Sequence, residues 1–484
     1  MPRRDAEAKR IADNNAIRRR SQNDRDIAPG YPPAGNLAAR QACERDLRAF
    51  LERYFPAAFA LAWSADHLKV LGRMQEVSTR GGLFALAMPR GSGKTTISVR
   101  AALWALLYGH RRFVVLVGST EGLAKEMLIA FKAELTFNER LVTDFRQVTY
   151  PLVRLENNAR RCVGQVFEGK QTRITWSADR IVFPTLPASA LDGTDVGGST
   201  VAVAGLTGSL RGLSSVLPDG RVIRPDLVIL DDPQTRESAA STSQSERRAQ
   251  IVLGDVLGMA GPGRKIAAVM PCTVIQPGDL ADRILDRKKN PEWSGHKSRM
   301  VRSFPKNDQL WEEYRRIRSE DLEAGLGPNR ATEFYRNNRA AMDAGAEVSW
   351  PERYDEDEVS GLQHAINLRL RNEEAFFAEY QNEPLSQEEE GPELLTADQI
   401  AARINRVPRG TVPIAATRLT AFVDVHQDVL YHAVVAWEEG FSGHVIEYGT
   451  HPDQRRAYFT KRDARRTLAT EHKGLGIEGR IYAG

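Results

Sequence analysis

A glycine-rich segment near residue 90 has the residue types and spacing of a phosphate-binding loop. It follows the apolar run 83–88 and consists of Pro89, Arg90, Gly91, Ser92, Gly93, Lys94, Thr95 and Thr96. A strand that leads through a glycine turn into a helix points several backbone N–H groups at one spot, which suits the β-phosphate of a nucleotide. In such a loop Lys94 reaches the β- and γ-phosphates, and the Thr95 hydroxyl binds Mg²⁺. The segment therefore predicts a site for ATP and Mg²⁺.

The loop departs from the usual pattern at one position. The first glycine of that pattern falls at position 88, which is Met88 here. Gly91 still allows a tight turn, and Gly93 still allows a close approach of the backbone, so we interpret the segment as a variant phosphate loop. The motif alone leaves an ordinary glycine turn before a core helix open as the alternative.

Paired acids follow a second apolar run at residues 227–230. We expect Asp231 to bind Mg²⁺, through water, and Asp232 to orient and deprotonate the attacking water. Taken alone, two acids at a strand end more often form a helix cap or a solvated turn. Their combination with a phosphate loop in the same predicted sheet favours the catalytic interpretation.

Two further residues are candidates for contact with the γ-phosphate. Arg90 lies four residues before Lys94, where a guanidinium can stabilise the charge that develops in the transition state. Thr273 lies just beyond the strand-like run that ends at Met270, where it can sense loss of the phosphate. A surface arginine and an ordinary turn threonine are the respective alternatives.

The elements that position these residues alternate between buried strands and helices. Strand-like runs at residues 113–117, 180–183, 201–204, 227–230 and 265–270 alternate with helical patterns at 97–107, 120–135 and 241–257. This order predicts an α/β fold with a doubly wound sheet. Ligand sites in such sheets lie at the carboxyl ends of the strands, where the phosphate loop and Asp231 both fall.

The remaining sequence suggests further segments on either side of this ATPase domain. Strand-period alternation over 418–425, 429–437 and 444–448 predicts a second β-rich domain. The predicted domains are a mobile basic arm at 1–36, a P-loop ATPase domain at 37–280, a charged helical linker subdomain at 281–395 that ends in the acidic stretch 386–393, and the second domain at 396–484.

Composition excludes several classes of protein. A length of 484 residues predicts two or three domains. No apolar run is long enough for a membrane span and the N-terminus lacks a signal peptide, so we expect a cytoplasmic protein without membrane association. Cys43, Cys162 and Cys272 lack paired spacing, which argues against disulfides and structural zinc. The net charge of +4 permits a polyanionic partner without requiring one.

From about residue 37 onward the arrangement resembles the large terminase subunit of tailed bacteriophages. The matching motifs are His67, residues 87–96, Arg211-Gly212, 224–233 and 377–384, with 270–273 at the position of the family's coupling motif. The Pro89-Arg90-Gly91 form of the loop is typical of that family, so Met88 supports the resemblance. The resemblance implies an ATPase of RecA-like P-loop fold that packages double-stranded DNA into procapsids in the bacterial host cytoplasm. The implied partners are the small terminase subunit, the portal protein and further copies in a ring.

Members of that family also carry a ribonuclease H-like nuclease, which cuts DNA with two metal ions, Mg²⁺ or Mn²⁺, held by clustered carboxylates. Asp424 fits the acid on the first strand of that fold, and it is predicted to be a catalytic metal ligand. Later acids of the family lie on a fourth strand and a terminal helix, and neither Asp428 nor Glu447 matches their positions. We therefore expect a truncated nuclease domain.

Two other functions remain open at this stage. A two-lobed helicase needs a second α/β lobe, whereas residues 281–395 are charged and helical. The chain could also be an inactive prophage remnant that only binds a portal or small-subunit partner. Such a remnant would keep the motifs but would not hydrolyse ATP.

Overall fold

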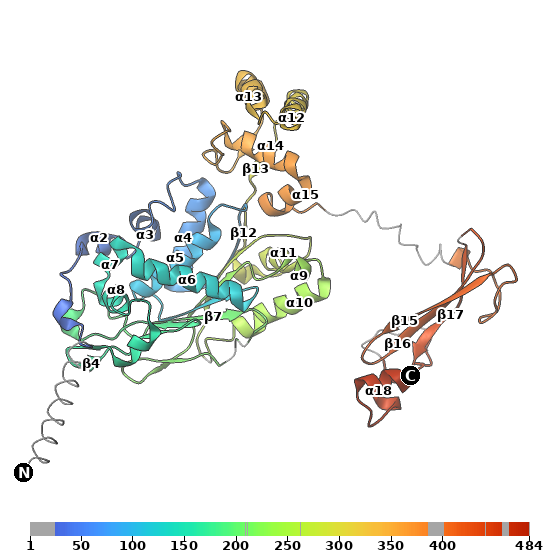
Figure 1. The fold of residues 1–484 in the computed structure, drawn as a ribbon, viewed down its shortest axis with the longest axis horizontal. Coiled ribbons are helices and arrows are strands. Elements are labelled where there is room, and N and C mark those ends of the chain that lie inside the picture. Colours follow the sequence, from blue (N-terminus) through green and yellow to red (C-terminus); the bar gives the residue numbers. More distant parts are fainter. Residues whose placement is uncertain are drawn as a thin grey trace, which may run out of the picture. The chain divides into compact units, whose positions relative to one another are not determined.

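The computed structural model describes residues 25–208, 210, 212–261, 263–385, 401–440, 442–456 and 464–483. The chain divides into two compact units, Met1–Gln387 and Glu388–Gly484 (Figure 1). Most of the predicted arm at 1–36, the acidic stretch 386–393 and Arg211 lie outside the described residues.

A large sheet organises the first unit (Figure 1). Within its described residues the strand order is β12 (His296–Lys297), β1 (Leu83–Ala87), β11 (Ala267–Cys272), β10 (Leu227–Asp231), β2 (Phe113–Gly118), β7 (Thr200–Gly205), β6 (Arg180–Val182) and β5 (Thr175–Trp176). Neighbours from β12 to β7 are parallel, and β6 and β5 are antiparallel. Strand β1 leads into the phosphate loop and β10 ends at Asp231. An additional strand, β11, lies between them.

Both faces of this sheet are covered, which explains why its strands are continuous apolar runs. Alternate residues of each strand enter different cores because side chains in a strand point to opposite faces. Phe84 and Leu86 pack in one core with residues of the helices between Leu47 and Phe137, whereas Leu83 and Ala85 pack in the other with residues of the helix Leu280–Leu285. The predicted doubly wound α/β fold class is therefore confirmed.

Helices on each side complete the first unit. Before β10 they are η1 (Ala28–Gly30), α2 (Leu37–Ala42), α3 (Leu47–Tyr54), α4 (Ala65–Arg80), α5 (Lys94–Leu107), α6 (Glu121–Phe137), α7 (Glu139–Asp144), α8 (Arg146–Val153), η2 (Ala159–Gly164) and η3 (Ala188–Ala190). After β10 they are α9 (Arg236–Ala239), α10 (Thr242–Gln250), the π-helix η4 (Ile251–Val256), α11 (Leu280–Leu285) and η5 (Pro291–Trp293). Two small hairpins pair β3 (Val166–Phe167) with β4 (Lys170–Gln171) and β8 (Ser215–Val216) with β9 (Val222–Ile223).

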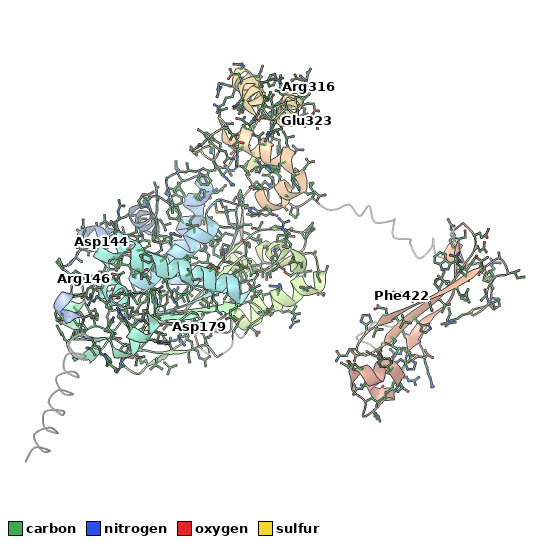
Figure 2. The ribbon with its side chains drawn as sticks, viewed as in Figure 1. Asp144, Arg146, Asp179, Arg316, Glu323 and Phe422 are labelled. Atoms are coloured by element: carbon green, nitrogen blue, oxygen red, sulfur yellow. The ribbon has the colours of Figure 1, made fainter. Side chains whose placement is uncertain are left out.

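A buried carboxylate ties several of these helices together. Asp144 accepts hydrogen bonds from the Arg53 guanidinium at 2.8 Å, the Tyr54 hydroxyl at 2.9 Å and the Asn36 backbone N–H at 2.8 Å. Figure 2 labels Asp144 beside Arg146 at the junction of α7 and α8. Since the carboxylate is buried, these donors offset the cost of removing its charge from water.

Residues 281–387 belong to the first unit rather than to a separate body. They contain α12 (Asp308–Glu323), α13 (Asn329–Met342), α14 (Gly361–Arg371), α15 (Glu373–Ala375), the π-helix η6 (Phe376–Tyr380), β13 (Val301–Ser303) and β14 (Glu347–Val348). The helices pack around Trp311, Tyr314 and Tyr335, and charged side chains such as Arg316 and Glu323 lie on α12 (Figure 2). The boundary predicted at residue 280 falls inside the sheet-bearing unit, because β12 pairs with β1.

The described residues of the second unit form an antiparallel sheet of β15 (Arg418–Val425), β16 (Leu430–Trp437) and β17 (Gly443–His451), followed by α17 (Leu468–Glu471) and α18 (Ile477–Ala483). These strands match the three runs predicted from alternation. All residues of β15 are exposed, including Leu419 at 56% and Phe422 at 70%, which is labelled in Figure 2. No helix in the described parts of the chain is long and apolar enough to cross a bilayer.

Candidate nucleotide and metal sites

The phosphate loop has the backbone conformation that its glycines predict. Gly91 and Gly93 have φ values of +78° and +80°, a region that side chains disfavour. A Cβ at position 91 would also lie 2.8 Å from the Arg353 guanidinium, the far end of a flexible side chain that would have to shift. Gly93 caps α5, whose first-turn N–H groups face the loop without helical acceptors. Pro89 and Ser92 close the turn with a 3.0 Å hydrogen bond, and Thr96 lies in the first turn of α5.

The predicted lysine, threonine and acid pair converge at the ends of β1, β10 and β11. The buried Lys94 ammonium donates to the Cys272 carbonyl oxygen at 3.0 Å and also to the Thr273 hydroxyl. It lies 3.7 Å from a carboxylate oxygen of Asp232. Thr273 in turn donates to Asp232 at 3.2 Å. Residues at the ends of two strands, β10 and β11, thus surround the Lys94 ammonium.

Asp231 faces the first turn of α5. The Thr95 hydroxyl donates to its carboxylate at 2.7 Å. Burial and the neighbouring Asp232 raise the pKa of Asp231 to about 6, although the Thr95 hydrogen bond and Lys94 act in the opposite direction. A buried carboxylate whose charge is only partly compensated, next to a hydroxyl, is a good ligand set for a hard cation such as Mg²⁺.

Asp232 differs from its neighbour in conformation and exposure. Its φ of +36° is unusual for a residue with a side chain, and its side chain is 47% exposed. Its backbone N–H donates to the Pro271 carbonyl at 2.9 Å, which joins the ends of β10 and β11. The strained backbone aims the carboxylate toward solvent beside the phosphate loop.

Arg90 is held by a residue that sequence reasoning missed. Its guanidinium lies 2.5 Å from Glu379, and its backbone N–H donates to the Glu379 carbonyl oxygen at 2.8 Å. The hydrogen bond and charge of Glu379 raise the pKa of Arg90. Arg236, which follows the acid pair by four residues, contacts the other carboxylate oxygen of Glu379. The motif 377–384 marked this segment for its resemblance alone, since no spacing rule links residues so distant in sequence.

His67 supports the loop from α4. One ring nitrogen lies 2.9 Å from the Ser92 carbonyl oxygen, and the other lies 2.8 Å from the Ser64 hydroxyl. The ring packs edge-on against Trp350 with centroids 4.5 Å apart. Burial lowers the pKa of His67, so the neutral ring donates to the loop backbone. This contact fixes the turn that carries Ser92.

In the second unit, Asp424 lies on β15 with its side chain 54% exposed and 3.0 Å from the His426 ring. Its cross-strand neighbour is Tyr431. Glu447 pairs with Val434, which in turn pairs with Ala421, so these three side chains share one face of the sheet. Because Asp424 lies three residues after Ala421 on β15, strand alternation places Asp424 on the opposite face from Glu447. Glu447 is instead bound by Arg409 at 2.5 Å. No group of three potential metal ligands in the described residues includes Asp424, and its metal role stays a prediction.

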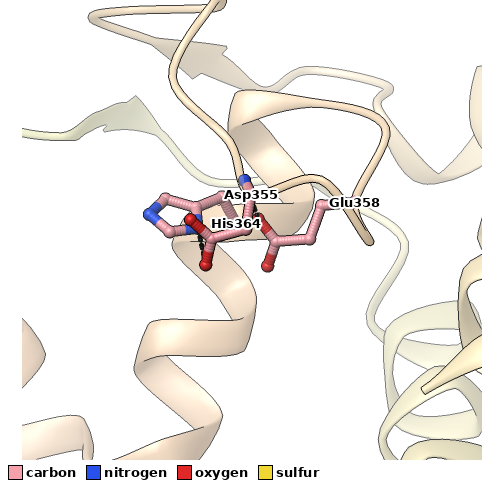
Figure 3. A group of neighbouring side chains, drawn as sticks. All are labelled: Asp355, Glu358 and His364. Carbon is pink, nitrogen blue, oxygen red and sulfur yellow. Dashed lines mark hydrogen bonds and ion pairs between the residues drawn. The ribbon is translucent and has the colours of Figure 1, made fainter. Parts of the chain in front are cut away.

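Metal-ligand spacing does occur elsewhere among the described residues, at Asp355, Glu358 and His364 (Figure 3). The His364 ring lies 2.7 Å from Glu358 and 3.7 Å from Asp355, and Asn367 donates to Glu358 at 2.7 Å. Burial opposes ionisation of Glu358, but the hydrogen bonds from His364 and Asn367 outweigh it and lower its pKa. These bonds satisfy the buried acid, and they connect the loop at 355–358 to α14.

The fold and the loop define a class: a P-loop α/β unit with an additional strand between β1 and β10. The C-terminal part of the chain is similar to one known protein family. Residues 370–474 match the family described as terminase large subunit gpA, endonuclease domain. The predicted resemblance to large terminase subunits is confirmed over these residues. The match begins within the first unit, before the boundary predicted at residue 396.

Solved structures of large terminases are also similar to this chain. The large terminase of bacteriophage HK97 has a TM-score of 0.36 and 13% identity, over 84% of this chain and 67% of that one. The large terminase of a thermophilic bacteriophage has a TM-score of 0.28 and 11% identity, over 85% of this chain and 72% of that one. The same thermophilic phage protein in complex with ADP has a TM-score of 0.26 and 12% identity, over 86% and 75%. No curated protein matches this chain.

Proposed function

We propose that this chain is a terminase large subunit, an ATP-hydrolysing motor that packages double-stranded DNA and carries a metal-dependent endonuclease domain. The proposed motor function rests on four residues that converge beside one glycine loop: Lys94, Thr95, Asp231 and Asp232. The proposed nuclease domain rests on the family match over residues 370–474.

The geometry supports a division of roles in ATP hydrolysis. Backbone N–H groups from Gly91 to Lys94 would bind the β-phosphate, and Lys94 would exchange its bonds to Cys272 and Thr273 for phosphate oxygens. Thr95 and Asp231 would hold Mg²⁺, which neutralises charge on the phosphates.

The remaining residues would act on the terminal phosphate. Asp232, exposed beside the loop, would orient and deprotonate the attacking water. Arg90 would stabilise the charge that develops on the γ-phosphate. Thr273 contacts both Lys94 and Asp232, so loss of the phosphate would alter its hydrogen bonds directly.

The nuclease proposal rests on the family match and on Asp424. Asp424 would bind Mg²⁺ or Mn²⁺ and activate water for attack on a DNA phosphate. The test is cleavage of supercoiled plasmid in either metal. Any metal-dependent cleavage by the wild type is expected to disappear in Asp424→Ala, and cleavage that this variant leaves intact would contradict the assignment of Asp424.

The partners and location of the motor are proposals that follow from the family. They are double-stranded DNA, the small terminase subunit, the portal of the procapsid, and a ring of further copies, all in the bacterial host cytoplasm. A two-lobed helicase is less well supported, because the strands described after residue 280 form no second parallel sheet. Strand β12 joins the large sheet, and the pair β13–β14 and the sheet β15–β17 are antiparallel.

The test of the ATPase is hydrolysis of Mg²⁺·ATP by the full chain and by Lys94→Ala. Removing the ammonium is expected to lower turnover by about a hundredfold or more, since electrostatic groups of this kind contribute that much to catalysis. Lys125→Ala is the matched control, because Lys125 lies on α6 in an exposed pair with Glu121. Equal turnover in wild type and Lys94→Ala would contradict the proposed function and favour an inactive remnant.

A further inference from the structure

Residues 376–383, called the bridge segment below, contact three parts of the nucleotide site. The segment consists of η6 and the turn that follows it. It reaches the phosphate loop through Arg90, α9 through Arg236, and the end of β11 through Val274. The bridge segment therefore joins the helices after residue 281 to the nucleotide site.

Buried amides fix the bridge segment in place. Asn382 accepts from the Val274 N–H at 3.3 Å and donates to the Ser298 carbonyl at 3.0 Å. Gln381 exchanges two hydrogen bonds with the backbone of Val301, at 2.8 and 2.9 Å. Both side chains are buried, so these bonds are costly to break. The backbone around Glu379 is therefore fixed relative to Val274, Ser298 and Val301.

Glu379 presents one carboxylate to two arginines. Its side chain is 13% exposed, whereas the side chains of Arg90 and Arg236 are 65% and 71% exposed. Each carboxylate oxygen contacts a different guanidinium. The trio carries a net positive charge; Arg90 belongs to the phosphate loop, and Arg236 follows the acid pair by four residues. Such a pair of cations is suited to a phosphate group, whose several oxygens accept bonds from more than one arginine.

We propose that Glu379 occupies the place of a terminal phosphate, holding Arg90 and Arg236 in the nucleotide-free protein and releasing them to the γ-phosphate of a bound nucleoside triphosphate. This inference rests on the proposed ATPase function. It makes Arg236 a second γ-phosphate ligand and Glu379 a positioning residue that competes with the nucleotide. The bridge segment then distinguishes ATP from ADP, because a diphosphate leaves the carboxylate and both arginines paired.

The experiment compares binding of a non-hydrolysable ATP analogue and of ADP to the full chain by calorimetry. Glu379→Gln removes the competing charge and is expected to tighten analogue binding about threefold or more, since a competing pair lowers the population able to bind. ADP binding is expected to stay the same. Glu383→Gln is the matched control, because Glu383 lies in the same segment but pairs with Arg299 rather than with Arg90 or Arg236.

Arg236→Ala provides a second, independent variant at an exposed position. It is expected to weaken analogue binding and to spare ADP, and the effect of Glu379→Gln should shrink when both changes are combined. Analogue affinity that is unchanged or weaker in Glu379→Gln, or unchanged in Arg236→Ala, would overturn the inference while leaving the ATPase proposal intact. Failure of the wild-type chain to bind either nucleotide would contradict both.

Discussion

Asp231→Asn is expected to stabilise the nucleotide-free protein while it abolishes ATP hydrolysis. The pKa of this carboxyl is raised from 3.8 to about 6, first by burial and then by Asp232. The folded chain therefore holds this proton more tightly than the unfolded chain does, and ionisation of Asp231 lowers the stability of the folded protein. Asparagine removes the charge but keeps an oxygen that can accept from Thr95. Stability and function conflict at this position because the proposed function needs the ionised acid as a cation ligand.

The magnitude follows from the difference in pKa. At about 1.4 kcal/mol per pKa unit, the difference between 3.8 and about 6 corresponds to a penalty of about 3 kcal/mol for the wild type. The penalty grows as pH rises from 3.8 to about 6, because the unfolded chain loses this proton first, and it is complete above pH 6. The free energy of unfolding of Asp231→Asn should thus exceed that of the wild type by up to about 3 kcal/mol at pH 8 and by about half as much at pH 5.

The assay is urea unfolding of the first unit at pH 8 and pH 5, with a chelator and without nucleotide. Asp219→Asn is a suitable control, because Asp219 is exposed and its backbone and side-chain hydrogen bonds with Arg221 lower its pKa. No stabilisation is expected from that change. A variant at position 231 that is no more stable than wild type at pH 8, or whose advantage does not shrink at pH 5, would refute the reasoning.

Three further outcomes are expected. Mg²⁺-dependent ATPase activity should fall as pH drops through about 6 in a pH–rate profile, because protonated Asp231 is a poor cation ligand; a flat profile between pH 5 and 8 would contradict this. Asp424→Ala should abolish metal-dependent plasmid cleavage without changing ATP turnover, measured on the same preparation. Asp144→Ala should destabilise the first unit by about 3 kcal/mol or more in urea, because Arg53 and Tyr54 lose their buried acceptor.

Much of the fold could be predicted from local patterns in the sequence. Strands buried on both faces must be apolar throughout, so β1, β2 and β10 stand out as short runs. Strand β11 begins two residues later than its predicted run. The two-residue β12 carries no periodic signal, and its place beside β1 is set by the tertiary structure. The boundary predicted at residue 280 therefore precedes β12, which joins the large sheet of the first unit.

The site was predictable where the residues lie close together along the chain. Gly91, Gly93 and Lys94 lie close together in sequence, and the positive φ of both glycines agrees with the predicted loop conformation. The link between Arg90 and Glu379 joins positions far apart in the chain, and it depends on how residues 281–387 pack. The position of Glu447 relative to Asp424 likewise depends on how distant segments pair. Only the strand register shows that the two acids lie on opposite faces of the sheet.

The central claim is that ATP hydrolysis at the phosphate loop serves the movement of double-stranded DNA. The most direct measurement is the steady-state ATPase rate of the full chain and of Lys94→Ala, each with and without linear double-stranded DNA. We expect DNA to stimulate the wild type and neither rate of Lys94→Ala to rise above background. Wild-type turnover that DNA leaves unchanged, or DNA-stimulated turnover that survives in Lys94→Ala, would contradict the claim.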